Sequence, residues 1–216
     1  MTKPINEGRR IEAKSFEIIT GLLKKKGIVL SGPKKPVINR VIHTSVDLGY
    51  VKDMVFSPDA IASGLKAIRQ GKNIVTDSTM VKAGINKSIT ARFKNKIICR
   101  MHDKDVASKA GELNLTRAVL AMRKSQREAE GGIVAIGNAP TALFELCDLI
   151  KNAKFQPALV VGIPVGFVGA AESKRALRGL KIPYITNKSR KGGSTVAAAI
   201  VNALLILARD RRWKNK

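Results

Sequence analysis

Residues 132–152, GIVAIGNAPTALFELCDLIKN, decide the fold class. Four consecutive apolar residues at 133–136 are followed by Gly137-Asn138-Ala139 and then by an amphipathic stretch that begins at Pro140. An apolar run without alternation is typical of a strand that helices cover on both faces. Proline is well tolerated at the first helical position, because its missing N–H has no partner there. The stretch therefore predicts a buried strand that leads directly into a helix.

The same succession of apolar run and amphipathic segment recurs along the chain after two helical stretches. It predicts a parallel sheet in a doubly wound α/β domain. No repeat or low-complexity linker interrupts the pattern, so we expect a single domain over 1–216. Ser57 is expected to cap the helix that Pro58 opens. The predicted strands are 54–56, 73–76, 97–99, 133–136, 158–163 and 184–185, and the predicted helices are 6–26, 37–49, 58–70, 105–128, 140–152, 173–180 and 195–209.

Composition narrows the class of protein further. The chain has 216 residues, of which 44% are hydrophobic, and this content is typical of a globular protein. Its longest apolar run, at 196–208, is about a dozen residues, whereas a bilayer span needs roughly 20. The polar N-terminus lacks the apolar region of a signal peptide. Cys99 and Cys147 lack paired spacing and fit a reducing compartment. We expect a cytoplasmic protein without a membrane segment.

The charge of the chain is unusual. Lys and Arg number 40 against 16 Asp and Glu, which gives a formal net charge of +24. Such an excess predicts an anionic partner, for which nucleic acid is the first candidate. However, aromatic residues make up only 4% of the chain. Single-stranded nucleic acid is bound by aromatic side chains interleaved with cations, and that pattern is missing here. A generic basic surface, including the tail at 209–216, explains part of the charge equally well.

Glycine-rich segments follow several of the predicted strands. They lie at 137–140, 162–174 and 191–195, each at the entry to a helix. In open α/β sheets, ligands bind at the carboxyl ends of the strands, where exposed N–H groups attract anions. Glycine is also what any tight turn requires. Three such loops together nevertheless favour a binding edge, although neither a dinucleotide fingerprint nor a Walker A order is present.

The chain has two histidines, His43 and His102. No His-Glu-x-x-His pattern accompanies them, so a zinc site is not indicated. Arg40 precedes His43 by three residues and shares its helical face, where a guanidinium and an imidazole would together suit an acidic ligand. A histidine at the boundary between core and surface, with no catalytic role, would explain the same position. His102, directly after a predicted strand, is the weaker candidate.

Several of these stretches, taken together, resemble one known family. The segments RVIHTS at 40–45, AIGNAPTAL at 135–143, GIPVGFVGAAESK at 162–174 and GGS at 192–194 are similar to the precorrin-8X methylmutase family of corrin biosynthesis, and the likeness begins with IEAKSF at 11–16. The resemblance implies a flavodoxin-like fold of three layers, α/β/α, and a homodimer. It also implies an isomerase that moves a methyl group from C11 to C12 of the macrocycle. The product would be hydrobyrinate, or cobyrinate when cobalt is already inserted.

The resemblance also implies roles for individual residues. The substrate ring is fringed with carboxylates, which suits arginine, serine and backbone N–H donors and accounts for an anionic partner without nucleic acid. A methyl shift needs no redox cofactor and no resident metal, because cobalt would enter only as part of the substrate. His43 would place a proton on the ring and take it back. The expected substrate-binding residues are Ser15, Arg40, Arg117, Asn138, Ser173 and Ser194.

Two other functions remain open from the sequence. A nucleic-acid-binding module would use the lysines at 24–26, Lys34, Lys35 and the basic tail. A corrinoid carrier would hold the same macrocycle without changing it. The visible spectrum separates a carrier from an enzyme, since isomerisation alters the conjugation of the ring catalytically and a carrier shifts the spectrum only stoichiometrically.

Overall fold

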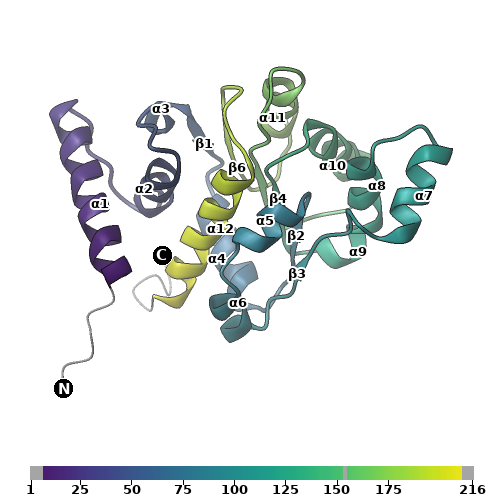
Figure 1. Cartoon of the computed structure of the whole chain (residues 1–216), viewed down its shortest axis with the longest axis horizontal. Helices are drawn as coiled ribbons and strands as arrows, with labels where there is room; N and C mark the ends of the chain where they lie inside the picture. Colours follow the sequence, from purple (N-terminus) through teal and green to yellow (C-terminus); the bar gives the residue numbers. More distant parts are fainter. Residues whose placement is uncertain (1–6, 153–154, 211–216) are drawn as a thin grey trace.

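The computed structural model describes residues 7–152 and 155–210, so the tail from 211 onward lies outside the described part. A six-stranded sheet lies between two sets of helices (Figure 1). The strands are β1 (Met54–Phe56), β2 (Ile74–Thr76), β3 (Ile97–Ile98), β4 (Ile133–Ile136), β5 (Leu159–Gly162) and β6 (Tyr184–Asn187). The helices are α1 (Glu7–Lys25), α2 (Lys34–Ser45), α3 (Tyr50–Asp53), α4 (Ala60–Arg69), α5 (Thr79–Gly84), α6 (Lys87–Phe93), α7 (Lys104–Glu112), α8 (Arg117–Lys124), α9 (Gln126–Ala129), α10 (Pro140–Asn152), α11 (Ala170–Arg178) and α12 (Ser194–Arg209).

The strand order confirms the predicted fold class. The sheet runs β1-β6-β5-β4-β2-β3, and its last five strands are parallel. Numbered along the chain, those five follow the order 2-1-3-4-5, which is the flavodoxin-like arrangement. The topological switch point therefore lies between β2 and β4. Ligands of such sheets bind at the carboxyl ends of the strands on either side of this point.

The first strand departs from the predicted all-parallel sheet. β1 pairs antiparallel with β6, with Met54 opposite Asn187 and Phe56 opposite Ile185. The helix α2 already ends at the carboxyl edge of the sheet, and only eight residues, 46–53, separate it from β1. Four of these eight residues form α3, so the connection stays at the carboxyl edge and β1 starts there. β1 therefore runs from the carboxyl edge toward the opposite edge, antiparallel to β6.

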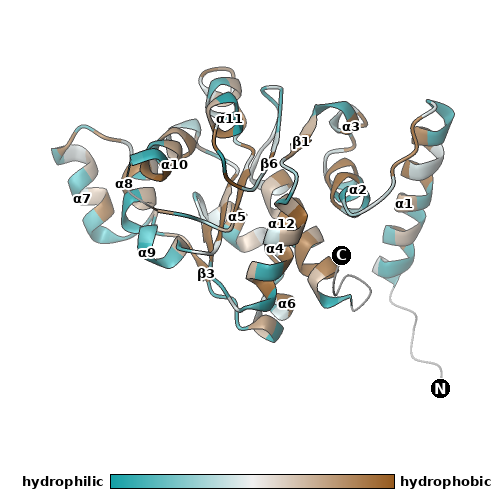
Figure 2. Cartoon of the chain, turned by 180° about the vertical axis from the view of Figure 1, so that it is seen from behind, coloured by the Kyte–Doolittle hydropathy of each residue, from teal (hydrophilic) through white to brown (hydrophobic). Residues whose placement is uncertain are grey.

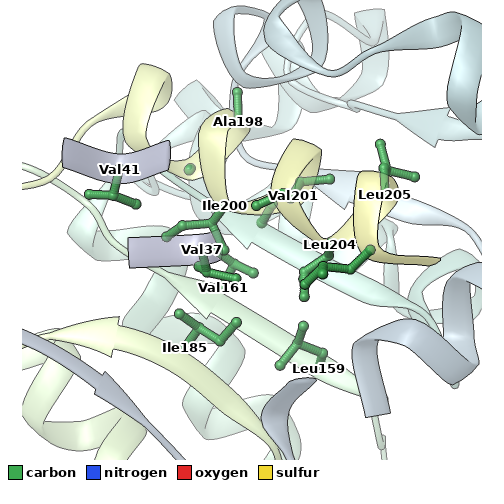
Figure 3. Packing of buried hydrophobic residues seen from close by; sticks show 14 of the residues in the cluster. Val37, Val41, Leu159, Val161, Ile185, Ala198, Ile200, Val201, Leu204 and Leu205 are labelled. Carbon is green, nitrogen blue, oxygen red and sulfur yellow. The ribbon is translucent and has the colours of Figure 1, made fainter. Parts of the chain in front are cut away.

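Two hydrophobic cores occupy the two faces of the sheet, because side chains alternate along each strand. Ile133 and Leu159 face α2, α4 and α12, whereas their neighbours Val134 and Val160 face α8, α10 and α11. Figure 3 shows the first core, where Val37 and Val41 of α2 meet Ile200 and Val201 of α12 above β5 and β6. Burial on both faces explains why the strands read as continuous apolar runs.

The helix α12 is the most apolar helix of the fold, as its brown colour in Figure 2 indicates. It packs against α2, α4 and α5 in the layer that covers one face of the sheet. Asn202 interrupts its apolar sequence for a reason. Its side chain donates to the carbonyl of Gly84 and accepts from the N–H of Asn86, and thereby fastens α5 and α6 to α12. None of the helices in the described ranges has the length and apolar character that crossing a membrane requires.

Two local predictions were wrong. The helix predicted over 105–128 is three helices, because Asn114 adopts a left-handed conformation with φ of 49° and Thr116 caps a new helix by accepting from the Val119 N–H. Ser57 does not cap α4, which begins only at Ala60. Its hydroxyl instead accepts the N–H of Tyr184 and ties the start of β6 to the end of β1.

Candidate active site

Three loops at the carboxyl edge, residues 137–139, 163–169 and 188–194, lie against one another and are called the rim below. A side chain at Gly137 would place its Cβ 2.8 Å from Ser194 Cα and 2.9 Å from the carbonyl of Gly193. Gly192 has φ of 153°, and a Cβ there would lie 2.2 Å from the carbonyl oxygen of Ile163. Gly193 donates its N–H to the same carbonyl. These glycines are needed because backbone packs directly on backbone.

Asp77 holds the first rim loop from below. It follows β2 at the switch point and is fully buried. One carboxylate oxygen accepts from the Gly137 N–H at 3.0 Å, and the other accepts from Asn138 and Ala139, each at 2.8 Å. Burial raises the pKa of Asp77 above its ordinary value, and the three N–H donors oppose that rise. Asp77 was not among the residues predicted from the sequence, although a lone aspartate directly after a buried strand was a visible signal.

Two further charged residues, the buried Lys174 and the partly buried Asp53, hold the third rim loop. Lys174, fully buried on α11, donates its ammonium protons to the carbonyls of Ser189 and Lys191. Burial lowers the pKa of Lys174 to about 8, and the charge of Asp53 opposes this change. Asp53 accepts from the N–H groups of Lys188 and Ser189 and from the Ser189 hydroxyl. The 188–191 segment is thus fixed by its backbone, and its outer side chains stay exposed.

His43 lies in the last turn of α2, near the rim. Four residues later, Asp47 forms an ion pair of 2.6 Å with Lys191 of the third rim loop. The His43 side chain is half-buried, and its Nδ1 atom is buried without a hydrogen-bond partner among the described residues. Its ring lies 5.3 Å, centroid to centroid, from the ring of Phe16 on α1. The connection through Asp47 places His43 at the same edge of the sheet as the glycine loops.

Arg40 lies against the same phenylalanine, and Ser15 is the neighbour of this phenylalanine on α1. The guanidinium carbon of Arg40 is 5.3 Å from the centre of the Phe16 ring. Its Nη1 donates to Glu12 at 2.8 Å, and the side chain is 18% exposed. Ser15 is half-buried and precedes Phe16 on α1. The structure therefore brings His43 and Arg40 together around Phe16, and Glu12 already neutralises the arginine.

The remaining predicted residues differ in their accessibility. Asn138 is exposed on the first rim loop, and Ser194 lies at the start of α12 with its hydroxyl 3.2 Å from that of Ser78. Arg117 is exposed at the first position of α8, beside the start of α10. Ser173 is fully buried, and its hydroxyl donates to the carbonyl of Ala170 in the same helix. It thus lies beneath the rim rather than on it.

A groove of about 590 Å³ opens between α1, α2 and α12. Phe16 and Arg40 line it, together with Asn39, Ala203 and Ile206. Ala203 and Ile206 lie in the second half of α12, away from its end at the rim, so the groove extends from the Phe16 cluster toward the opposite edge of the sheet. Within 7–152 and 155–210, no three or more His, Cys, Asp and Glu side chains are grouped to hold a metal ion.

Comparisons with known proteins agree on one family. The model of that family, described as precorrin-8X methylmutase, matches residues 10–207. A cobalt-precorrin-8 methylmutase of Priestia megaterium is 50% identical over 95% of this chain and 91% of its own. A precorrin-8X methylmutase of Pseudomonas aeruginosa is 42% identical over 93% of this chain and 96% of its own. The crystal structure of precorrin-8x methyl mutase from Thermus thermophilus, 37% identical, superimposes with a TM-score of 0.84 over 93% of this chain and 96% of that one.

The fold and the rim define a flavodoxin-like α/β protein with its candidate site at the carboxyl edge of the sheet. Within that class, the chain belongs to the precorrin-8X methylmutase family. The enzyme class expected from the sequence, an isomerase that moves a methyl group, is thereby confirmed. The family does not favour a nucleic-acid-binding module or a carrier.

Proposed function

We propose that the protein moves the methyl group of precorrin-8X, or of its cobalt-containing form, from C11 to C12 in cobalamin biosynthesis, giving hydrobyrinate or cobyrinate. The observation that carries this proposal is the half-buried His43, which lies beside Phe16 and Arg40 and is joined to the glycine rim through the Asp47–Lys191 ion pair. One bond from the methyl carbon breaks at C11 and one forms at C12, so the composition of the macrocycle does not change.

His43 is proposed to supply the proton that the shift requires. Protonation of a ring nitrogen draws electron density from the conjugated system and promotes migration, and the same imidazole then takes the proton back. The tilted contact with Phe16 restricts the position of the imidazole. The net reaction consumes neither protons nor electrons. We therefore propose that the protein uses no redox cofactor or resident metal of its own.

The carboxylates of the macrocycle are proposed to bind to cations and polar groups around His43 and the rim. Arg40 would share its guanidinium between Glu12 and a substrate carboxylate, and Ser15 would add a hydroxyl beside it. The edge of the macrocycle that lies opposite Arg40 would contact Arg117, Asn138 and Ser194. Ser173 would act on the loop geometry, because its hydroxyl is committed to Ala170.

We also propose that the protein forms a homodimer in the cytoplasm. The helix α1 buries Ile19 and Leu23 against the body and leaves Ile11, Ile18 and Leu22 exposed. An exposed apolar stripe of this kind supports contact with a second copy. Sedimentation of the wild type and of Ile18→Asp tests the assembly, for which we expect a dimer and a shift toward monomer. The free cysteines support a reducing compartment.

The function is tested by steady-state kinetics of His43→Ala with precorrin-8X. A positioned acid–base contributes roughly 10²–10⁴-fold, so we expect kcat to fall by about that factor while KM changes little. His102→Ala is the matched control, since His102 is exposed after β3 and should leave turnover unchanged. Near-normal turnover in His43→Ala would contradict the proposed role, and absence of turnover in the wild type would contradict the function itself.

A further inference from the structure

The second rim loop carries an unusual set of exposed apolar side chains. Phe167 is 90% exposed, Val168 is 87% exposed and Val165 is 48% exposed. Phe144 of α10 is partly exposed and lies directly beneath Gly169, where a Cβ would meet its ring at 3.6 Å. The chain is poor in aromatic residues and strongly basic. A group of exposed apolar side chains that includes an almost fully exposed phenylalanine therefore indicates a binding surface.

The base of this loop is fixed, whereas its tip stands free of the core. Ile163 donates its N–H to Ile136 and accepts from Gly193, so the chain leaves β5 in a defined direction. Gly166 then donates to the carbonyl of Arg190, with φ of 155°, and Gly169 has φ of 76°. Gly166 and Gly169 flank the tip in conformations that other residues rarely adopt, and they direct it away from the core. The exposure of Phe167 is thus built into the backbone and is not the result of a poorly packed core.

Exposed cations lie on the elements next to these apolar side chains. Lys188 and Arg190 are exposed on the third rim loop, which the Gly166–Arg190 hydrogen bond holds beside the tip. Arg117 is exposed at the start of α8, which packs against α10 where Phe144 lies. An apolar centre with a basic surround is complementary to a flat, carbon-rich ring whose edge bears carboxylates. A second protein would also cover apolar side chains, but it would not by itself account for cations on both sides.

We propose that Phe167 and Val168 form an apolar seat for one face of the tetrapyrrole-derived macrocycle, and that Phe167 determines how firmly the ring is held over the rim. The inference rests on the proposed function and names a contact with the ring face, whereas Arg40 and Ser15 account for its carboxylates. Offset stacking of the phenyl ring on the conjugated macrocycle is the expected geometry. The contact forms in both substrate and product, so it supplies binding and not turnover.

The test is the affinity of Phe167→Ala for metal-free hydrobyrinate, measured by absorbance titration at moderate salt, together with KM and kcat for precorrin-8X. Burying a phenylalanine contributes enough that we expect Kd and KM to rise about tenfold or more, with kcat nearly unchanged. Phe167→Leu should recover most of the affinity, since it keeps apolar area. Val168→Ala should weaken binding less than Phe167→Ala, because valine carries less apolar area. Val29→Ala is its matched control and should bind normally, because Val29 is 82% exposed in the connection before α2, away from the rim.

Two outcomes overturn the proposal. One is unchanged Kd and KM in Phe167→Ala while the wild type binds and turns over normally. The other is dissociation of a wild-type dimer into monomers in the same variant, measured by sedimentation, with the remaining affinity intact. The latter would assign the loop to a second copy of the chain. Failure of the wild type to bind or convert the macrocycle would instead contradict the proposed function, so the two failures are distinguishable.

Discussion

Replacement of Asp77 by asparagine tests how the first rim loop is held. In the wild type, two carboxylate oxygens accept three backbone N–H groups at 2.8–3.0 Å. The single oxygen of asparagine can keep the bonds from Asn138 and Ala139, but its amide nitrogen then faces the buried N–H of Gly137. An unsatisfied buried donor costs about 1–3 kcal/mol, and the two retained bonds lose their charge assistance, so we expect a loss of about 2–4 kcal/mol.

The assay is urea unfolding at pH 7, followed by far-ultraviolet circular dichroism. Asp59→Asn is the control, because Asp59 is exposed before α4 and its side chain makes no capping hydrogen bond. A surface change of this kind stays within about 0.5 kcal/mol. The Asp77 variant should also lose kcat/KM, since Asn138 moves with its loop. A loss of stability equal to that of the control would refute the reasoning, because the three bonds would then contribute nothing beyond solvation.

Four further predictions concern the rim, Arg40 and the basic surface. Gly192→Ala, whose Cβ would lie 2.2 Å from the Ile163 carbonyl, should separate two rim loops and lower kcat/KM at least tenfold, as measured by steady-state kinetics. Because burial lowers the pKa of Lys174 from 10.5 to about 8, the cost of its buried charge is present below pH 8 and is relieved above it. Urea unfolding should therefore show the wild type gaining stability over Lys174→Met between pH 8 and 10, and a constant difference would contradict this. Arg40→Ala should raise KM more than it lowers kcat, and Arg40→Lys should restore little, because an ammonium lacks the planar fork. Neutralising the lysines at 24–26 together should leave turnover at moderate salt unchanged, and duplex DNA should not compete with the macrocycle in the same assay.

The layers of the fold could be predicted from the sequence, because burial on both faces produces strands that are continuous apolar runs. Strands such as β4 and β5 are uninterrupted apolar runs, and each leads into its helix through a glycine turn. No sequence pattern indicated the direction of β1, since that direction depends on where α2 ends and not on the residues of the strand. The interruptions near Asn114 and Ser125 were missed because helix-forming residues on both sides masked short turns.

The candidate site was predictable where its residues lie near each other in the sequence or match the family pattern. His43 and Arg40 are three residues apart, and they do share a cluster. The supports of the rim could not be found in this way, because Asp77 and Lys174 act on backbone groups up to 62 residues distant. A hydrogen bond to a backbone group does not require a particular residue type as partner, so it leaves no pattern in the sequence. Only the folded chain identifies Asp77 and Lys174 as the groups that hold the loops.

The central claim is that this protein catalyses the methyl shift with His43 as its proton donor and acceptor. The most direct measurement supplies precorrin-8X with an isotopically labelled methyl carbon at C11, in large molar excess over the protein, and follows the label by nuclear magnetic resonance. With the wild type we expect the label to move to C12 over many turnovers, whereas His43→Ala should bind the ring and leave the label at C11. Transfer of the label by His43→Ala at the wild-type rate would contradict the role of His43, and a wild type that only shifts the spectrum stoichiometrically would contradict catalysis.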